Sequence, residues 1–195
     1  MGKVYERIDE GLARWIASQR LFFVASAPLD PEGHVNVSPK GPIETLRILG
    51  ERELAYLDMV GSGAETAAHV RENGRVVVML CAFEGPPRIV RLHGRADLVQ
   101  ADDARFAELL EACAFAETGV PAARRAIVLV QVQRIADSCG YGVPLMSYEG
   151  QRPHMGAWAQ KKVRVGGERA LRDYQREKNG LSIDGLPAIE LPSAS

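Results

Sequence analysis

A glycine-rich turn at residues 61–63 is the part of this sequence best suited to bind a ligand. It follows a strand-like run over residues 53–60 and precedes a helical pattern over residues 64–73. Glycines let the backbone approach a ligand closely, and the free N–H groups at a helix N-terminus attract anions. Ser62, Thr66 and these amides therefore predict a phosphate site, although the same residues also suit a tight turn that binds nothing.

The turn also matches part of the dinucleotide-binding fingerprint G-x-G-x-x-G. The segment GSGAET supplies the first two glycines, but Thr66 stands at the third position. Glu84 lies roughly 20 residues further on, where a ribose-binding acid would stand. Three strands with hairpin chemistry precede the turn and no second strand–helix unit follows it, which disfavours this interpretation. A parallel sheet would be needed to support it.

Two further places put cations on or beside predicted strands. Ser38 and Lys40, in the segment SPKG, stand where a strand ends. A lysine there can bind a phosphate, a substrate carboxylate or a flavin carbonyl, or it can simply be solvated. Arg91 lies inside the apolar run 89–92, so its side chain either extends to solvent or meets an anion.

The residue types give little support to other chemistries. Cys139 is followed by Gly-Tyr-Gly rather than by a second cysteine, so no C-x-x-C motif is formed. The sequence lacks G-x-S-x-G, which disfavours a hydrolase with a nucleophile elbow. No metal site is expected, because the histidines lack the spacing of zinc ligands. They are His34, His69, His93 and His154.

Bulk composition narrows the class of protein further. The 195 residues are 46% hydrophobic and 25% charged, with a formal net charge of −1. These values suit one globular domain and disfavour nucleic acid or an anionic membrane as the main partner. No apolar run reaches the ~20 residues of a membrane helix, and the charged N-terminus has no apolar signal core. Three cysteines, an odd number, favour reduced thiols and a cytoplasmic location.

Six strand-like runs, with few helices between them, must position these residues. A helical pattern runs from Val4 to Ser18, and Asp102 is placed to cap a helix that carries Phe106 and Cys113 on one face. The pattern predicts a mostly antiparallel barrel or sandwich with helices at its ends. The strands are expected at residues 21–27, 34–38, 53–60, 75–83, 88–99 and 126–135.

The sequence changes in character after Asp137. Two short helical patterns follow, near Trp158 and over residues 168–178, and then an extended tail. This segment is too short for a stable separate domain, so we expect it to wrap the barrel or to pack on a second chain. Trp158, Lys161 and Lys162 are candidates for covering a neighbouring subunit's pocket.

In order and spacing, these segments resemble the pyridoxamine 5′-phosphate oxidase-like family of flavin-binding split barrels. The resemblance runs from Ala13 to the last long strand and rests on HVNVSPKG, AYLDMVGSGAETAAHVRENGRVVVMLCAF and RIVRLHGRA. The later segments SCGYGVPLMSYEG and YQREKNGLSIDGLP are similar to one uncharacterised branch of that family. The resemblance to the family implies a mainly β fold with flanking helices. The expected organisation is a six-stranded antiparallel split barrel over residues 1–137 and a C-terminal helical extension over residues 138–195.

The resemblance also implies a homodimer with flavin mononucleotide (FMN) at the dimer interface; other members of the family use a deazaflavin or bind haem. The strand over residues 35–40 would run beside the flavin ring, and the segment 62–66 would bind the phosphate. The strand that contains Arg91 would complete the pocket. The cofactor-binding residues implied are Asn36, Val37, Ser38, Lys40, Ser62, Glu65, Thr66 and Arg91.

Two departures from the family pattern change the expected function. The segment GSGAET has no Arg or Lys, and the carboxylate of Glu65 would repel a phosphate unless a cation intervenes, from Lys40, Arg91 or the other chain. The arginine-containing substrate motif of the true oxidases is also missing, so oxidation of pyridoxamine phosphate is not expected. The resemblance implies flavin-dependent hydride or electron transfer to an unidentified small molecule. The alternative is a non-catalytic flavin or deazaflavin carrier.

Overall fold

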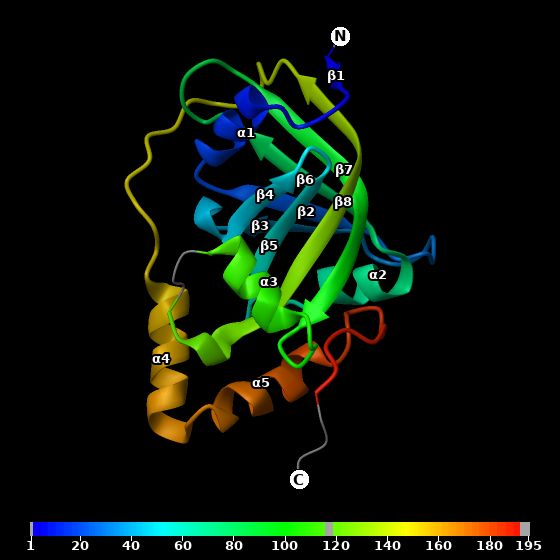
Figure 1. The fold of residues 1–195 in the computed structure, drawn as a ribbon. Helices are drawn as coiled ribbons and strands as arrows, with labels where there is room; N and C mark the ends of the chain where they lie inside the picture. Colours follow the sequence, from blue (N-terminus) through cyan, green and yellow to red (C-terminus); the bar gives the residue numbers. More distant parts are fainter. Residues whose placement is uncertain (1, 116–118, 192–195) are drawn as a thin grey trace.

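The computed structural model describes residues 2–115 and 119–191. Figure 1 shows a curved antiparallel sheet with helices at both of its ends and along its sides. The strands are β1 (Val4–Tyr5), β2 (Phe22–Ser26), β3 (Asn36–Lys40), β4 (Leu46–Gly50), β5 (Glu53–Met59), β6 (Arg75–Cys81), β7 (Ile89–Gln100) and β8 (Arg124–Ser138). The α-helices are α1 (Glu10–Ala17), α2 (Glu65–Asn73), α3 (Phe106–Cys113), α4 (His154–Gly166) and α5 (Arg169–Asn179), and short 3-10 turns span Ile43–Thr45 and Pro121–Ala123.

The sheet has the order β3-β2-β6-β7-β8-β5-β4, and β1 pairs with β8. All strand pairs among the described residues are antiparallel. This confirms the predicted class, a mainly β antiparallel sheet with flanking helices. A dinucleotide-binding fold is excluded, because it requires a parallel sheet.

Alternation along the strands builds the core of the sheet. In β2, Phe22, Val24 and Ser26 point inward, while the residues between them are only partly buried. Because successive side chains of a strand point to opposite faces, this pattern places one face of each strand against the barrel interior. Leu12 and Ile16 of α1 close the core at one end.

The predicted N-terminal helix is shorter in the structure, and one strand was not predicted. The N-terminal helix begins at Glu10 rather than near Val4, since the Asp9 side chain accepts a hydrogen bond from Leu12 N–H (2.7 Å) and caps it. Val4 instead pairs with Ala136 in β8. The strand β4 was also missed. The short run Leu46–Gly50 pairs with β5, and its half-buried residues give no clear alternation in the sequence.

Asp102 does not cap the helix that follows it. The helix α3 begins at Phe106, and its N-cap residue, Arg105, makes no side-chain cap bond. The neighbouring Asp103 accepts instead from Arg105 N–H (2.9 Å) and from the Arg105 guanidinium, so it organises the turn before the helix.

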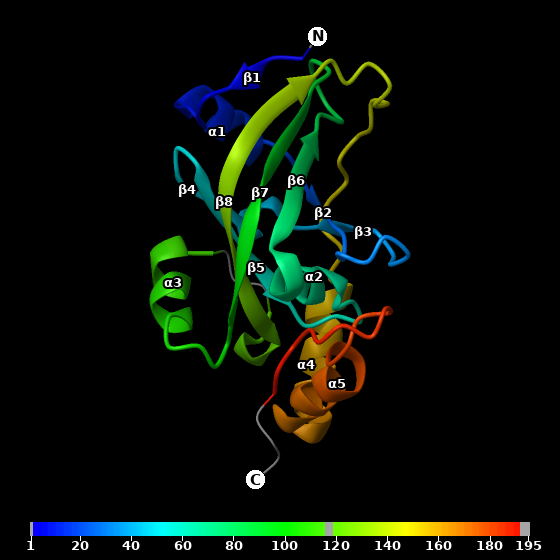
Figure 2. The same cartoon turned by 90° about the vertical axis from the view of Figure 1, so that its right-hand side faces the viewer.

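The C-terminal extension packs on the end of the barrel that carries α2. Ala159 of α4 and Leu171 of α5 lie in one apolar cluster with Val60, at the end of β5. Figure 2 shows the last segment, in red, running between α2 and α5. It is buried rather than a free tail, because Ala188 and Ile189 pack against the alanines of α2.

Trp158 and Lys162 take part in packing within the extension. The Trp158 ring lies edge-on to Tyr174 (4.9 Å between centroids), and Lys162 lies over both rings. These contacts join α4 to α5. A role of Trp158, Lys161 or Lys162 toward a neighbouring subunit stays a prediction. No helix of the described residues is long and apolar enough to cross a membrane.

A backbone contact at Gly94 leaves no room for a side chain. A Cβ atom there would clash with the carbonyl oxygen of Gln131, where the β7–β8 register shifts. We therefore expect Gly94→Ala to lower the free energy of unfolding by about 1–3 kcal/mol, measured by urea denaturation. Gly142→Ala is the control, because its added Cβ meets nothing within 4 Å. Equal stability of the two variants would contradict this account.

Candidate functional site

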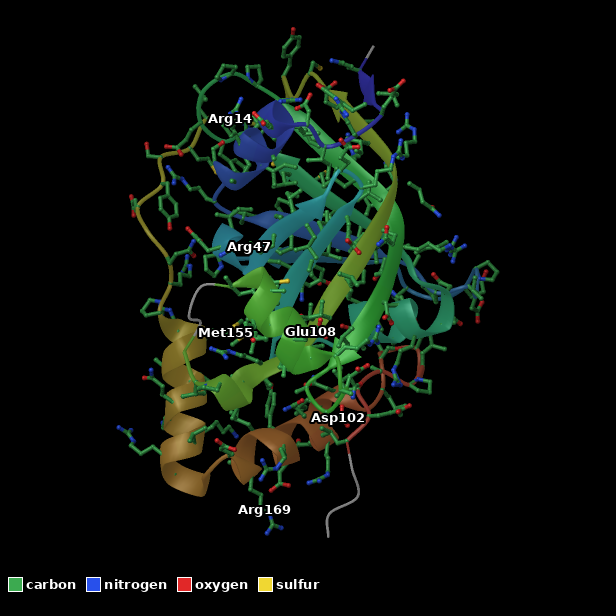
Figure 3. All side chains as sticks on the ribbon, in the orientation of Figure 1. Arg14, Arg47, Asp102, Glu108, Met155 and Arg169 are labelled. Atoms are coloured by element: carbon green, nitrogen blue, oxygen red, sulfur yellow. The ribbon has the colours of Figure 1, made fainter. Side chains whose placement is uncertain are left out.

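A cavity of about 330 Å³ opens where β3 and β5 end and α2 begins. The turn at residues 61–64, here called the anion loop, forms one side of it. Met155, at the start of α4 in Figure 3, lies on another side. Five residues that the sequence predicted for the cofactor line this cavity together: Ser38, Lys40, Ser62, Glu65 and Thr66.

The remaining three predicted residues have different positions. Asn36 joins β3 to α2, because its Nδ2 donates to Thr66 Oγ1 (2.9 Å) and its Oδ1 accepts from Ser38 Oγ (3.1 Å). Val37 faces away on β3 and is 60% exposed. Arg91 does not line this cavity; its Nη1 donates to Ser138 Oγ (3.1 Å).

A buried group of three charges forms the floor of the cavity. Asp58 Oδ1 accepts from Lys40 Nζ (2.9 Å), and Asp58 Oδ2 accepts from Arg125 Nε and Nη2 (2.8 and 2.7 Å). The Asp58 and Arg125 side chains are only 6% and 4% exposed. Buried charges of this kind are held by mutual pairing, and the two cations and one carboxylate give this group a net charge of +1.

Sequence reasoning missed Asp58 and Arg125, although both left a signal. An aspartate inside the apolar strand Glu53–Met59 is unusual, since unpaired carboxylates avoid buried strands. Arg125 stands at the start of the apolar run Ala126–Val130. Lys40 and Arg125 of the same chain are thus the cations that line the cavity beside the anion loop, and Arg91 is not among them.

The two cations control the ionisation of Asp58. Burial alone would raise its pKa, but Arg125 and Lys40 outweigh burial and lower the pKa of Asp58 to about 2. The carboxylate is therefore charged in the folded protein at any pH above that value, and it keeps both cations in place.

This pKa predicts a loss of stability in acid. A depressed folded-state pKa stabilises the fold above the unfolded value of about 3.9, and this contribution is lost as the pH falls toward about 2. We expect the free energy of unfolding to drop by about 2 kcal/mol across that window, followed by urea denaturation at a series of pH values. In Asp58→Asn this part of the pH dependence should be missing. An unchanged slope would refute the assignment.

A carboxylate directly follows the anion loop, on the first residue of α2. Glu65 Oε2 accepts a hydrogen bond from Ala64 N–H (3.0 Å), so the side chain folds back on the N-terminus of α2. A Cβ on Gly63 would meet the same oxygen at 3.2 Å. Arg125 Nη1 donates to the Gly63 carbonyl (2.8 Å), which ties the loop to the buried charges.

The set of donors fits a phosphate ester. Backbone N–H groups at a helix N-terminus, the Thr66 and Ser62 hydroxyls and two cations are the groups that proteins use to bind phosphate. The Glu65 carboxylate already accepts from the Ala64 N–H group at this N-terminus, so it opposes a phosphate there, and the two cations have to outweigh it. These residues would therefore hold the phosphate of a flavin nucleotide.

Comparison with known proteins identifies the family of the chain. The family model described as pyridoxamine 5′-phosphate oxidase matches residues 8–139. The pyridoxamine 5′-phosphate oxidase family protein ustO of Aspergillus flavus is 36% identical over 200 residues, covering 95% of this chain and 77% of that protein.

Solved structures agree in fold. The HupZ protein of Group A Streptococcus superposes with a TM-score of 0.53 at 20% identity, over 67% of this chain and 99% of that one. A second HupZ structure gives a TM-score of 0.51 at 20% identity, over 66% and 91% of the two chains. The family match covers β2 to β8 and the whole predicted cofactor site, and the chain therefore belongs to the pyridoxamine 5′-phosphate oxidase family.

Proposed function

We propose that this protein binds FMN and uses it to transfer a hydride or electrons to a small molecule. The observation that carries the proposal is the cavity that joins the anion loop to the Asp58–Lys40–Arg125 group. Membership of a family that typically binds a flavin supports the same ligand. The proposed cofactor-binding residues of the chain are Asn36, Val37, Ser38, Lys40, Ser62, Glu65, Thr66 and Arg125. Arg91 does not line this cavity, and we propose that it contacts the cofactor bound to a second copy of the chain.

The protein's own residues would bind and orient the cofactor. A bound flavin supplies the hydride chemistry itself, so the chain needs few acid–base groups. The Lys40 side chain lines the cavity and is 23% exposed, so its ammonium group could meet an anionic or carbonyl oxygen there. Ser38 and Thr66, held through Asn36, add hydroxyl groups along the same wall.

We infer that a second copy of the chain completes the site. A cavity of about 330 Å³ lies at the small end of the range for ligand pockets, and its rim is exposed. Val35 and Val37 beside β3 are 71% and 60% exposed, and Met155 is 52% exposed. Apolar side chains of this kind around a polar site suit a homodimer interface. We also propose a cytoplasmic location, since Cys81, Cys113 and Cys139 are free thiols.

A non-catalytic flavin or deazaflavin carrier is the second candidate. The observation that favours it is the Glu65 carboxylate at the N-terminus of α2, which weakens attraction for a phosphate. Binding without turnover would suit a carrier, and a deazaflavin would use the same donors.

The test is an absorption spectrum of the purified protein before and after incubation with FMN and removal of the excess on a column. Retained flavin bands near one FMN per chain are expected. Reduction of the bound flavin by a nicotinamide donor and reoxidation by an electron acceptor would then separate the enzyme from the carrier. A colourless protein that retains neither FMN nor a deazaflavin would overturn the proposal.

A further inference from the structure

The anion loop is held from behind by a residue of the C-terminal extension. Asn179 Nδ2 donates to the carbonyl oxygens of Gly61 (2.9 Å) and Ser62 (3.4 Å). These carbonyls therefore point toward α5. In a planar trans peptide the C=O group and the next N–H group point in opposite directions, so the N–H groups of Ser62 and Gly63 are turned away from Asn179.

The N–H groups of Ser62 and Gly63 are unpaired in the part of the chain that the structure describes. Within residues 2–115 and 119–191, they donate to no protein acceptor, and both residues line the cavity. The next N–H, that of Ala64, donates to the Glu65 carboxylate. The N–H groups of Ser62 and Gly63 are thus left to bind a ligand in the cavity, while the N–H group of Ala64 is held by the Glu65 carboxylate. This arrangement of amides suits the oxygen atoms of a phosphate.

Asn179 is itself fixed by its surroundings. It is the last residue of α5 and is fully buried, and its backbone carbonyl accepts from Ile189 N–H (2.9 Å). Ile189 packs against α2. The Asn179 Oδ1 atom is buried and has no hydrogen-bond partner among the described residues. Burying an unpaired amide oxygen is unfavourable, and an apolar side chain would fill the same space without that cost. An amide rather than an apolar side chain at this position is explained by the hydrogen bonds that Asn179 Nδ2 donates to the anion loop.

We propose that Asn179 is a positioning residue for phosphate binding, through which the C-terminal extension controls the affinity of the anion loop. Asn179 and the helices α4 and α5 lie beyond residues 8–139, the part that the family model matches. The inference rests on the proposed function, because it takes the phosphate of FMN as the ligand of the loop. It adds a determinant that the barrel by itself does not contain.

The test compares the binding of FMN with that of riboflavin, which has the same ring and ribityl chain but no phosphate. Asn179→Asp is nearly isosteric and replaces the donor by an oxygen that repels the two carbonyls. We expect it to weaken FMN binding at least about tenfold and to leave riboflavin binding unchanged, as measured by flavin fluorescence titration. Asn179→Ala removes the donor without adding charge and should reduce the preference for FMN in the same direction.

Gln175→Ala provides the matched control. Gln175 is a buried amide one turn earlier on α5, and within the described residues it donates to no carbonyl of the anion loop. It should keep the preference for FMN over riboflavin. Equal weakening of FMN and riboflavin in the Asn179 variants, or unchanged FMN binding, overturns the inference. If the unaltered protein binds neither flavin, the proposed function itself fails; if it prefers FMN and the Asn179 variants do too, only the role of Asn179 fails.

Discussion

Replacing Arg125 by alanine will weaken FMN binding and destabilise the fold together. The change leaves the Asp58 carboxylate buried with Lys40 as its remaining cation, and it removes the donor that holds the Gly63 carbonyl. Breaking a buried ion pair by removing one partner costs about 3–5 kcal/mol of stability. The loss of a cation beside the anion loop should also weaken FMN binding at least about thirtyfold. Urea denaturation and fluorescence titration with FMN measure the two effects.

Two further variants separate charge from geometry. Arg125→Lys keeps the positive charge but cannot bridge Asp58 and Gly63 with a planar fork, so we expect an intermediate loss in both measurements. Arg124→Ala removes the neighbouring arginine, which does not line the cavity, and should leave FMN binding unchanged. An Arg125→Ala protein as stable as Arg124→Ala would show that the Asp58 charge is balanced without Arg125.

Glu65→Gln will tighten FMN binding. The Glu65 carboxylate lies on the N–H group of Ala64, where the proposed phosphate would approach, and like charges at such short range repel. Glutamine has the same shape, and its amide oxygen can still accept the Ala64 hydrogen bond. We expect the Kd for FMN to fall at least about tenfold, with little change in the Kd for riboflavin. Fluorescence titration with the two flavins gives both constants.

The effect of Glu65→Gln should shrink at high salt, because added ions screen the repulsion. Glu72→Gln is the matched control, since it removes one negative charge from the last turn of the same helix. If both variants change FMN affinity equally, the cause is the net charge of the protein and not the position of Glu65. An unchanged Kd in Glu65→Gln would place the phosphate elsewhere.

Much of the fold was predictable from local patterns. Strand-like apolar runs bounded by turn residues identified six of the eight strands, because a buried strand reads as a short apolar segment. The stop of α2 at Gly74 was also predictable. This glycine has φ = 70°, a left-handed conformation that other residues adopt at a cost. The strands β1 and β4 were missed, since such short runs owe their extended form to pairing with β8 and β5.

The candidate site was predicted only in part. The turn at residues 61–63 and the segment SPKG could be singled out because glycine, serine and lysine at strand ends are local signals. Five of the predicted residues do line one cavity. Arg91 does not line the cavity. Whether a side chain on β7 reaches the cavity depends on the face of the sheet to which it points, and on where the cavity opens.

What the sequence determined by itself is the set of antiparallel strands and the backbone turn able to bind an anion. Only the tertiary structure decided which charges stand beside that turn. Arg125 meets Asp58 across 67 residues, through the pairing of β5 with β8, and Asn179 reaches Gly61 across 118 residues. Such contacts depend on strand register and on the docking of α5. A local pattern carries no record of either, because the alternation of a strand identifies a face without identifying its neighbour.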